Sequence, residues 1–257
     1  APPVRGDEYL LYQLVLGSWP VEMLNDSTPS AAALDAYATR IKAAMTKSLR
    51  EAKVRSSWML PNTAYESAVL SFVESMFDAT QSNAFLELFL PFANRIARLG
   101  AHNSVVQTVL KLTAPGVPDI YQGAELWDLS LVDPDNRRPV DYALRHTLLR
   151  DVNAALDQDR AAAMARFSQD WKDGRGKLAV TATLLQFRAE NPDVFASGGY
   201  EGVTVDGPDS EHVCAFLRRG SDTCMLVAAA LLPRRLEEHG LSPDTILQVP
   251  HDGHRER

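Results

Sequence analysis

Apolar residues recur at helical spacing through most of the first half of the chain. An apolar residue at every third or fourth position places these side chains on one face of a helix, where they can be buried. Three runs follow this pattern: Leu34, Ala38, Ile41 and Met45; Tyr65, Val69, Phe72 and Met76; and Phe85, Phe89, Phe92, Ile96 and Leu99. Thr28 and Asn62 are the predicted amino-terminal caps of the first two helices. Pro91 is expected to kink or split the third, and a fourth helix is predicted from about Asn103.

A different pattern occupies residues 115–142. Prolines and a glycine at 115–118 end the preceding helix, because proline cannot continue one. Residues 117–121 are then predicted to form a short buried parallel strand, followed by a long polar loop. In a barrel of alternating strands and helices, the loops that follow the strands build the active site. The pattern therefore predicts that candidate functional residues lie on this loop.

The remaining chain changes from helix to strand. Leu144, Leu148, Val152 and Ala155 predict one helix, and a second is predicted over about 177–190, stopped by Asn191 and Pro192. Alternating or apolar runs separated by turn residues then predict antiparallel strands. These runs cover 200–205, 212–217 and 224–229, and a last strand-like piece lies in the final fourteen residues.

Composition narrows the class of protein. The chain is 46% hydrophobic with a formal net charge of −7 and no apolar run near 20 residues, so neither nucleic acid nor membrane is an expected partner. The histidines and cysteines show no metal-ligand spacing, and no glycine-rich phosphate loop occurs; no metal or other cofactor is therefore predicted. Cys214 and Cys224 flank a predicted hairpin turn and should face opposite sides of the sheet. Free, buried thiols in a reducing cytoplasm are expected.

Four segments resemble, in order, the maltooligosyl trehalose synthases, a branch of the α-amylase superfamily. They are EYLLYQLVLGSWP at 8–20, PFANRIARLGAHNSVVQTVLKLTAPG at 91–116, GVPDIYQGAELWDLSLVDPDNRRPVDY at 116–142 and the W-x-D-G-R-x-K element at 171–177. A complete (β/α)₈ barrel needs roughly 250 residues by itself. The resemblance therefore implies the carboxyl-terminal part of a larger enzyme, with Ala1 as an internal boundary.

The resemblance also implies a fold class and a domain organisation. The fold is expected to be α/β by parentage, but mostly α-helical in this part: the end of a TIM-type barrel with a helical insertion, then an incomplete antiparallel β domain. Residues 1–192 would complete the barrel, with the insertion at about 21–113 and the last barrel strand and loop at about 115–142. Residues 193–257 would form the β domain.

Asp133, Arg137 and Arg138 are candidate substrate-binding residues. The D-P-x-x-R spacing from Asp133 to Arg137 resembles a loop that grips sugar hydroxyls in α-amylase-type enzymes. A carboxylate and a planar guanidinium pair well with neighbouring hydroxyl groups. The alternative is that these arginines and acids pair with each other and stiffen the loop, which is the favoured interpretation for Arg138.

Tyr121, Gln122, Glu125 and Trp127 are further candidates at the start of the loop. Aromatic rings pack against the apolar face of a pyranose, and Gln or Glu can fix a hydroxyl. Tyr121 as a core residue and Trp127 as a loop anchor are the competing interpretations.

Retaining glycoside chemistry needs two carboxyl groups about 5 Å apart. Five acids of the loop are candidates by count: Asp119, Glu125, Asp128, Asp133 and Asp135. In the resembled family the nucleophile and the acid/base come from earlier barrel strands, so no catalytic residue is predicted in this chain. The expected function is a share in converting the reducing-end α-1,4 bond of a maltooligosaccharide to an α,α-1,1 bond, with the upstream part of the same enzyme as partner. The alternatives are a carbohydrate-binding or interaction module and, less favoured, a small hydrolase using Asp119 or Glu125.

Overall fold

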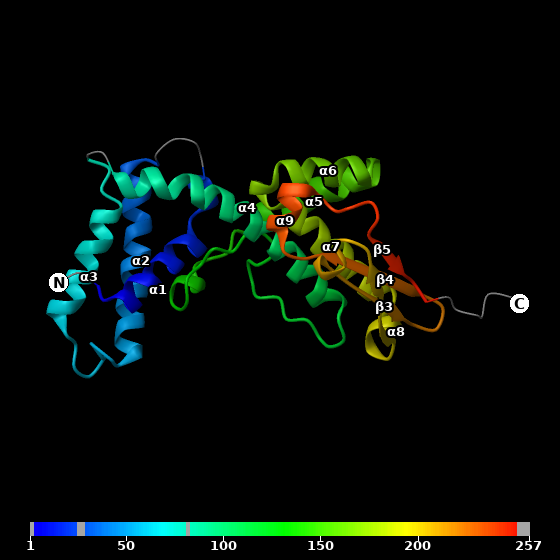
Figure 1. Cartoon of the computed structure of the whole chain (residues 1–257), viewed down its shortest axis with the longest axis horizontal. Helices are drawn as coiled ribbons and strands as arrows, with labels where there is room; N and C mark the ends of the chain where they lie inside the picture. The colour runs from blue at the N-terminus through cyan, green and yellow to red at the C-terminus, as the bar shows by residue number, and fades with distance from the viewer. Residues whose placement is uncertain (1–2, 25–28, 81–82, 251–257) are drawn as a thin grey trace, which may run out of the picture. The chain divides into compact units, whose positions relative to one another are not determined.

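The computed structural model describes residues 3–24, 29–80 and 83–250, and helices dominate it (Figure 1). The helices are α1 (Arg5–Ser18), α2 (Ala31–Ala52), α3 (Thr63–Met76), α4 (Ala84–Thr113), α5 (Tyr142–Gln158), α6 (Arg160–Gln169), α7 (Arg175–Glu190), α8 (Pro192–Ala196) and α9 (Pro233–His239). The strands are β1 (Gly199–Gly202), β2 (Thr204–Asp206), β3 (Val213–Arg219), β4 (Cys224–Ala230) and β5 (Ile246–Gln248). Two compact units result: Ala1–Arg98 with Asp128–Val140, and Leu99–Trp127 with Asp141–Arg257.

The first unit confirms two of the predicted helices. The apolar runs of α2 and α3 turn their periodic residues inward, and the side chain of Asn62 caps α3 by accepting a hydrogen bond from the Tyr65 amide at 3.1 Å. Thr28, the predicted cap of α2, lies outside the described residues. The cap position belongs to Ser30, whose hydroxyl accepts from the Ala33 amide at 3.3 Å.

Aromatic rings form the centre of the first unit. Trp19 is 2% exposed and meets Tyr37 and Phe89 edge-on, with ring centres 5.0 and 4.8 Å apart. Such edge-to-face pairs add to the free energy gained by burial alone. The Tyr37 hydroxyl donates to the Val15 carbonyl at 2.9 Å, and burial raises its pKa well above the ordinary value.

Helix α4 differs from the prediction, because it runs unbroken through Pro91 and through the predicted start of a new helix near Asn103. Proline removes one backbone hydrogen bond from a helix. Apolar residues continue at helical spacing on both sides of it, and Leu90 and Ala93 are buried. Their burial explains why the helix continues where the local signal favoured a break.

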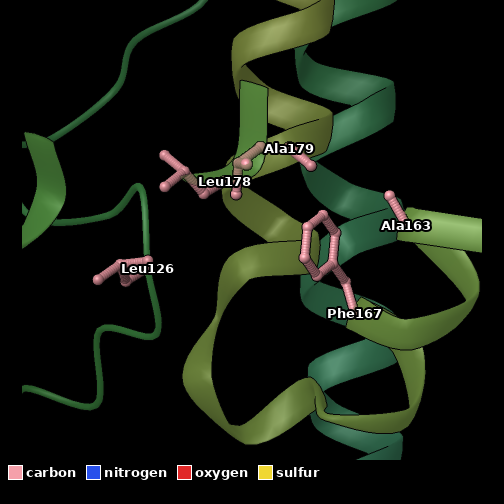
Figure 2. Packing of buried hydrophobic residues seen from close by; sticks show 6 residues of the cluster. Leu126, Ala163, Phe167, Leu178 and Ala179 are labelled. Atoms are coloured by element: carbon pink, nitrogen blue, oxygen red, sulfur yellow. The ribbon is translucent and has the colours of Figure 1, made fainter. Parts of the chain in front are cut away.

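In the second unit, α5, α6 and α7 share a hydrophobic cluster (Figure 2). The two predicted helices are confirmed as α5 and α7, although Leu144 of the predicted α5 face is 47% exposed. Helix α6 was not predicted, because its only large apolar residues are Met164 and Phe167, too few to show a periodic face. Phe167 on α6 and Leu178 on α7 are 1% and 5% exposed, and Leu126 joins them from the loop that follows α4.

The strands pair antiparallel, as predicted. One sheet has the order β1-β3-β4, and β2 pairs with β5 in a second, two-stranded sheet. The predicted run 200–205 therefore divides at Val203 between two sheets. Cys214 pairs with Ala229 and Cys224 with Arg219, so the two free thiols face opposite sides. Neither is buried as predicted, because Cys214 is half-buried and Cys224 is exposed. The domain boundary near residue 192 stays a prediction.

The predicted strand at 117–121 is wrong. These residues form an irregular segment, and the side chain of Val117 is 97% exposed. A strand exists only when its backbone is hydrogen-bonded to a neighbour. Among the described residues no strand precedes β1, and β1 pairs with β3, so residues 117–121 have no neighbour to join.

Candidate functional site

All seven predicted substrate-binding residues lie on the loop between α4 and α5. The two units divide them: Tyr121, Gln122, Glu125 and Trp127 belong to the second unit, and Asp133, Arg137 and Arg138 to the first. Each group has its own anchoring contacts.

The loop starts from a fixed point in the second unit. The last carbonyl groups of a helix have no partner within it. Here Arg218 donates to the Thr113 carbonyl at 2.9 Å, and Arg188 donates to the Leu112 carbonyl at 2.9 Å. Two guanidinium groups also suit the negative end of the helix dipole.

Tyr121 and Gln122 are exposed at the first turn of the loop. The Ala124 amide donates to the Tyr121 carbonyl at 3.0 Å, and Gly123 has a φ of 91°, a value that favours glycine. The side chain of Tyr121 is 47% exposed, so the structure disfavours the interpretation of Tyr121 as a core residue. Sugar contact by these two residues stays a prediction.

Glu125 acts as an anchor for the loop in this structure. Its carboxylate accepts a hydrogen bond from Arg145 of α5 at 3.1 Å, and the same guanidinium donates to the Gly123 carbonyl at 2.8 Å. Arg145 was not singled out in the sequence. Its signal was its place on the first turns of the helix that follows the loop.

Trp127 is held by the W-x-D-G-R-x-K element. Its indole N–H donates to the Trp171 carbonyl at 2.8 Å, and the two indoles meet at 67° with centres 6.1 Å apart. The Lys177 ammonium lies 5.6 Å from the centre of the Trp127 ring and donates to the Leu126 carbonyl at 3.0 Å. Lys177 is only 8% exposed. These contacts favour the loop-anchor interpretation of Trp127.

Gly174 completes this contact between the loop and the start of α7. Its φ is +77°, and an added Cβ would lie 3.2 Å from Cδ2 of Leu126. A side chain here meets both backbone strain and a tight neighbour. Two features therefore explain the glycine of the W-x-D-G-R-x-K element: its positive φ and the close approach of Leu126.

Substituting Gly174 should show this strain directly. We expect Gly174→Ala to lower the free energy of unfolding by about 1–2 kcal/mol, because the left-handed conformation and the Leu126 contact both oppose a methyl group. Gly100→Ala is the matched control: Gly100 lies within α4 and its Cβ would meet nothing within 4 Å. That change should stabilise by about 0.5–1 kcal/mol. Urea denaturation measures both; the same sign for the two variants would contradict the assignment.

Asp135 is the centre of the loop segment in the first unit. Arg40 of α2 donates to both of its carboxylate oxygens at 3.1 and 2.9 Å, and the Leu131 amide donates at 2.7 Å. Burial would raise the pKa of Asp135, but the hydrogen bonds from Arg40 and Leu131 and the nearby arginine charges outweigh it, so the pKa is lowered. Arg40 also donates to the Leu129 carbonyl at 2.9 Å. One bidentate pair thus fastens the whole segment to α2.

Asp133, Arg137 and Arg138 lie around this centre with different exposure. Asp133 and Arg137 form an ion pair with side chains that are 42% and 71% exposed. Arg138 donates to the Asp135 carbonyl at 3.0 Å and to the Ser130 hydroxyl at 3.2 Å, which supports its predicted structural role. Lys47 of α2 fixes the Asp133 carbonyl at 2.7 Å. Asp133 and Arg137 are therefore placed on a fixed backbone with their polar groups open to solvent.

Four of the five loop acids have hydrogen-bond or ion-pair partners within the described part of the protein. Asp128 accepts from the Ser130 amide at 3.0 Å, while Glu125, Asp133 and Asp135 each pair with an arginine. Asp119 is exposed. Within the described ranges no cluster of three or more histidine, cysteine or acidic residues is suited to a metal ion. In the same part of the chain, no helix combines the length and apolar character needed to cross a membrane.

Comparisons with known proteins agree on one family of relatives. No family model matches the chain. Two Mycobacterium tuberculosis proteins, from strains CDC 1551 and H37Rv and assigned as maltooligosyl trehalose synthases, are each 36% identical over 243 residues. Each match covers 93% of this chain and 26% of the relative. The chain thus spans about a quarter of the curated relatives it matches.

Solved structures give the same result. A crystal structure of a maltooligosyl trehalose synthase matches with a TM-score of 0.72 at 33% identity, covering 89% of this chain and 28% of the other. The maltooligosyltrehalose synthase of Arthrobacter ramosus matches with a TM-score of 0.69 at 31% identity, covering 93% and 27%. The resemblance inferred from the four motifs is confirmed: the chain is homologous to a part of these synthases. A barrel is not among the features of the described residues.

Proposed function

We propose that this chain is the carboxyl-terminal part of an enzyme that rearranges the reducing end of a maltooligosaccharide. In this reaction the terminal α-1,4 bond becomes an α,α-1,1 bond, which leaves a trehalose unit at the chain end. One observation carries the proposal: nearly the whole chain is similar to maltooligosyl trehalose synthases, and it spans about a quarter of their length.

The proposed reaction is a double displacement. A carboxylate attacks the anomeric carbon while a carboxylic acid protonates the leaving oxygen, so that a glycosyl–enzyme forms and glucose is freed. The glucose then turns, and its anomeric hydroxyl attacks the glycosyl–enzyme in place of water and returns a proton to the acid/base. We assign both carboxyl groups to the part of the enzyme without a counterpart in this chain.

The contribution of this chain is to hold sugar rather than to break its bond. Asp133 and Arg137 offer an acceptor and a planar donor fork side by side, and the Asp135–Arg40 and Lys47 contacts fix their backbone. Water must be excluded while the freed glucose turns. Firm contacts to that glucose would favour rearrangement over hydrolysis.

Reconstitution tests the proposal. The isolated chain should not consume maltopentaose, whereas addition of the upstream part of the enzyme should yield the α,α-1,1 product. Consumption of maltopentaose by the isolated chain would overturn the assignment of the carboxyl groups. Saturable binding of the sugar by the chain alone, with no product in either mixture, would instead identify a binding module.

Arg137→Ala then tests the sugar-holding role in the reconstituted enzyme. Removing an exposed guanidinium should leave the fold intact. Loss of one charge-assisted hydrogen bond should raise KM, or the ratio of free glucose to rearranged product, by about tenfold. Arg150→Ala, at an exposed position of α5, is the matched control. Kinetics of Arg137→Ala equal to those of the parent would remove Arg137 from the site.

A further inference from the structure

An apolar tip projects from the connection between α2 and α3 (Figure 1). We define the 54–60 tip by its four large apolar side chains: Val54, Trp58, Met59 and Leu60, which are 78%, 57%, 97% and 81% exposed. Scattered exposed apolar residues are ordinary on a protein surface. Four of them within seven residues form a patch of the kind that marks an interaction site.

The tip is held open by a buried polar network. Glu66 of α3 is 6% exposed and accepts two hydrogen bonds from Arg50, at 2.9 and 2.7 Å, and a third from the Ser56 hydroxyl. The Ser56 hydroxyl also accepts from the Asn62 amide at 3.0 Å. The hydrogen bonds from Arg50 lower the pKa of Glu66 to about 2, so this carboxylate stays charged at any ordinary pH. The two ends of the tip are thereby fixed to the helices.

A second device shapes the tip itself. The Ser57 hydroxyl accepts from the Leu60 amide at 3.0 Å, and the Ser57 amide donates to the Leu60 carbonyl at 3.3 Å. Within this closed turn the side chain of Met59 is almost fully exposed. The backbone is therefore ordered without help from the apolar side chains, which remain available to another surface.

The chemistry of the tip favours a protein surface over a sugar. The Arg50 guanidinium lies 4.9 Å from the centre of the Trp58 ring and occupies one of its faces. Leu60 offers no side-chain hydrogen-bonding group, and Met59 offers only a thioether sulfur, which is a weak acceptor. Lys53 flanks the tip as an exposed cation, and Arg55 within the tip is also exposed, although it pairs with Asp7 at 4.0 Å. A matching surface is therefore apolar at its centre and carries carboxylates at its rim.

We infer that the 54–60 tip docks into an apolar pocket, rimmed by carboxylates, on the part of the same enzyme that this chain lacks. The inference rests on the proposed function. The chain spans only 26% of its curated relatives, so in such an enzyme most of the polypeptide lies outside it and supplies a large surface. A preformed tip lowers the entropic cost of this docking, because its backbone is already ordered.

Charge substitutions at the tip test this docking. In titrations of the upstream part with the 257-residue chain, we expect Met59→Glu and Leu60→Glu to weaken binding at least tenfold, because each would bury a carboxylate in an apolar pocket. Leu241→Glu is the matched control, since Leu241 is an apolar residue of the second unit, 47% exposed and outside the tip. Circular dichroism checks that all variants stay folded. Methionine oxidation gives a second measurement: the upstream part should protect Met59 in the parent chain.

The outcomes separate the docking from the proposed function. If the parent mixture forms the α,α-1,1 product and Met59→Glu binds as tightly as the parent, the docking is overturned and the proposed function stands. If the parent chain neither binds the upstream part nor forms product, both are overturned. Protection of Met59 by maltopentaose alone would show that the tip binds sugar. A dimer of the isolated chain that Met59→Glu dissociates would show that the tip binds a second copy, and either result would overturn the docking.

Discussion

Replacing Arg218 with methionine should lower the free energy of unfolding of the second unit by about 3–5 kcal/mol. Arg218 is 2% exposed, although arginine is usually a surface residue. It lies on β3, the central strand of its sheet. Its guanidinium donates to three carbonyl groups, those of Thr113 at 2.9 Å, Val194 at 2.8 Å and Gly199 at 3.2 Å. Methionine fills much of the space but donates nothing, so three carbonyls that are held by one group would lose their partner.

The next residue along β3 supplies the control. Arg219 pairs with Glu201 at 3.2 Å, and the side chains of this pair are 24% and 46% exposed. Its neighbours are open to water, so Arg219→Met should cost less than about 1 kcal/mol. Urea denaturation monitored by circular dichroism compares the two. Equal losses would mean that the carbonyl contacts of Arg218 do not stabilise the unit.

Asp135→Asn should have the second-largest effect, a loss of about 2–3 kcal/mol from the first unit. An amide keeps the shape of the carboxylate but turns an N–H group toward Arg40, which also donates. The side chains of Asp135 and Arg40 are only 14% and 20% exposed, so in the variant the positive charge of Arg40 would be left poorly solvated and without a carboxylate. The segment that carries Asp133 and Arg137 would lose its bidentate attachment to α2.

The same variant should reveal the protonation of Asp135. Its pKa is lowered on folding, so its stabilising effect is complete at neutral pH and is lost as the pH falls through that lowered value, below the ordinary 3.8. The difference in unfolding free energy between parent and Asp135→Asn should therefore shrink in acid. Asp133→Asn is the control, because its ion pair with Arg137 is largely exposed. A constant difference for Asp135→Asn between pH 7 and pH 3 would be evidence against the carboxylate contacts.

Periodic apolar residues predicted the helices well, because burial of one face decides where a helix forms. Leu34 to Met45 and Tyr65 to Met76 needed no distant partner to be recognised. The strand at 117–121 failed for the opposite reason: β-prone residues form a strand only beside another strand, and their own sequence does not say whether one is present. The predicted split at Pro91 was wrong because packing of Leu90 and Ala93 outweighed a single lost hydrogen bond, whereas a kink at Pro91 stays a prediction.

The anchors of the candidate site escaped prediction because their partners are distant in sequence. Arg40 lies 95 residues before Asp135, and Arg218 lies 105 residues after Thr113. A buried arginine reads as an ordinary surface residue until its carbonyl partners are known. The W-x-D-G-R-x-K element gave a signal, but it marked Lys177 and Gly174 without revealing that they contact the loop at Leu126.

The loop that carries the seven candidate residues is split at residue 127 between the two compact units, and this has a consequence for biosynthesis. On the ribosome, residues 3–98 are synthesised before Asp128–Val140. Arg40 therefore cannot form its ion pair with Asp135 until that later segment has been made. The first unit cannot finish folding before part of the second has already been translated. For the same reason, a gene fragment that stops at residue 98 would encode α1, α2 and α3 without the piece that completes them.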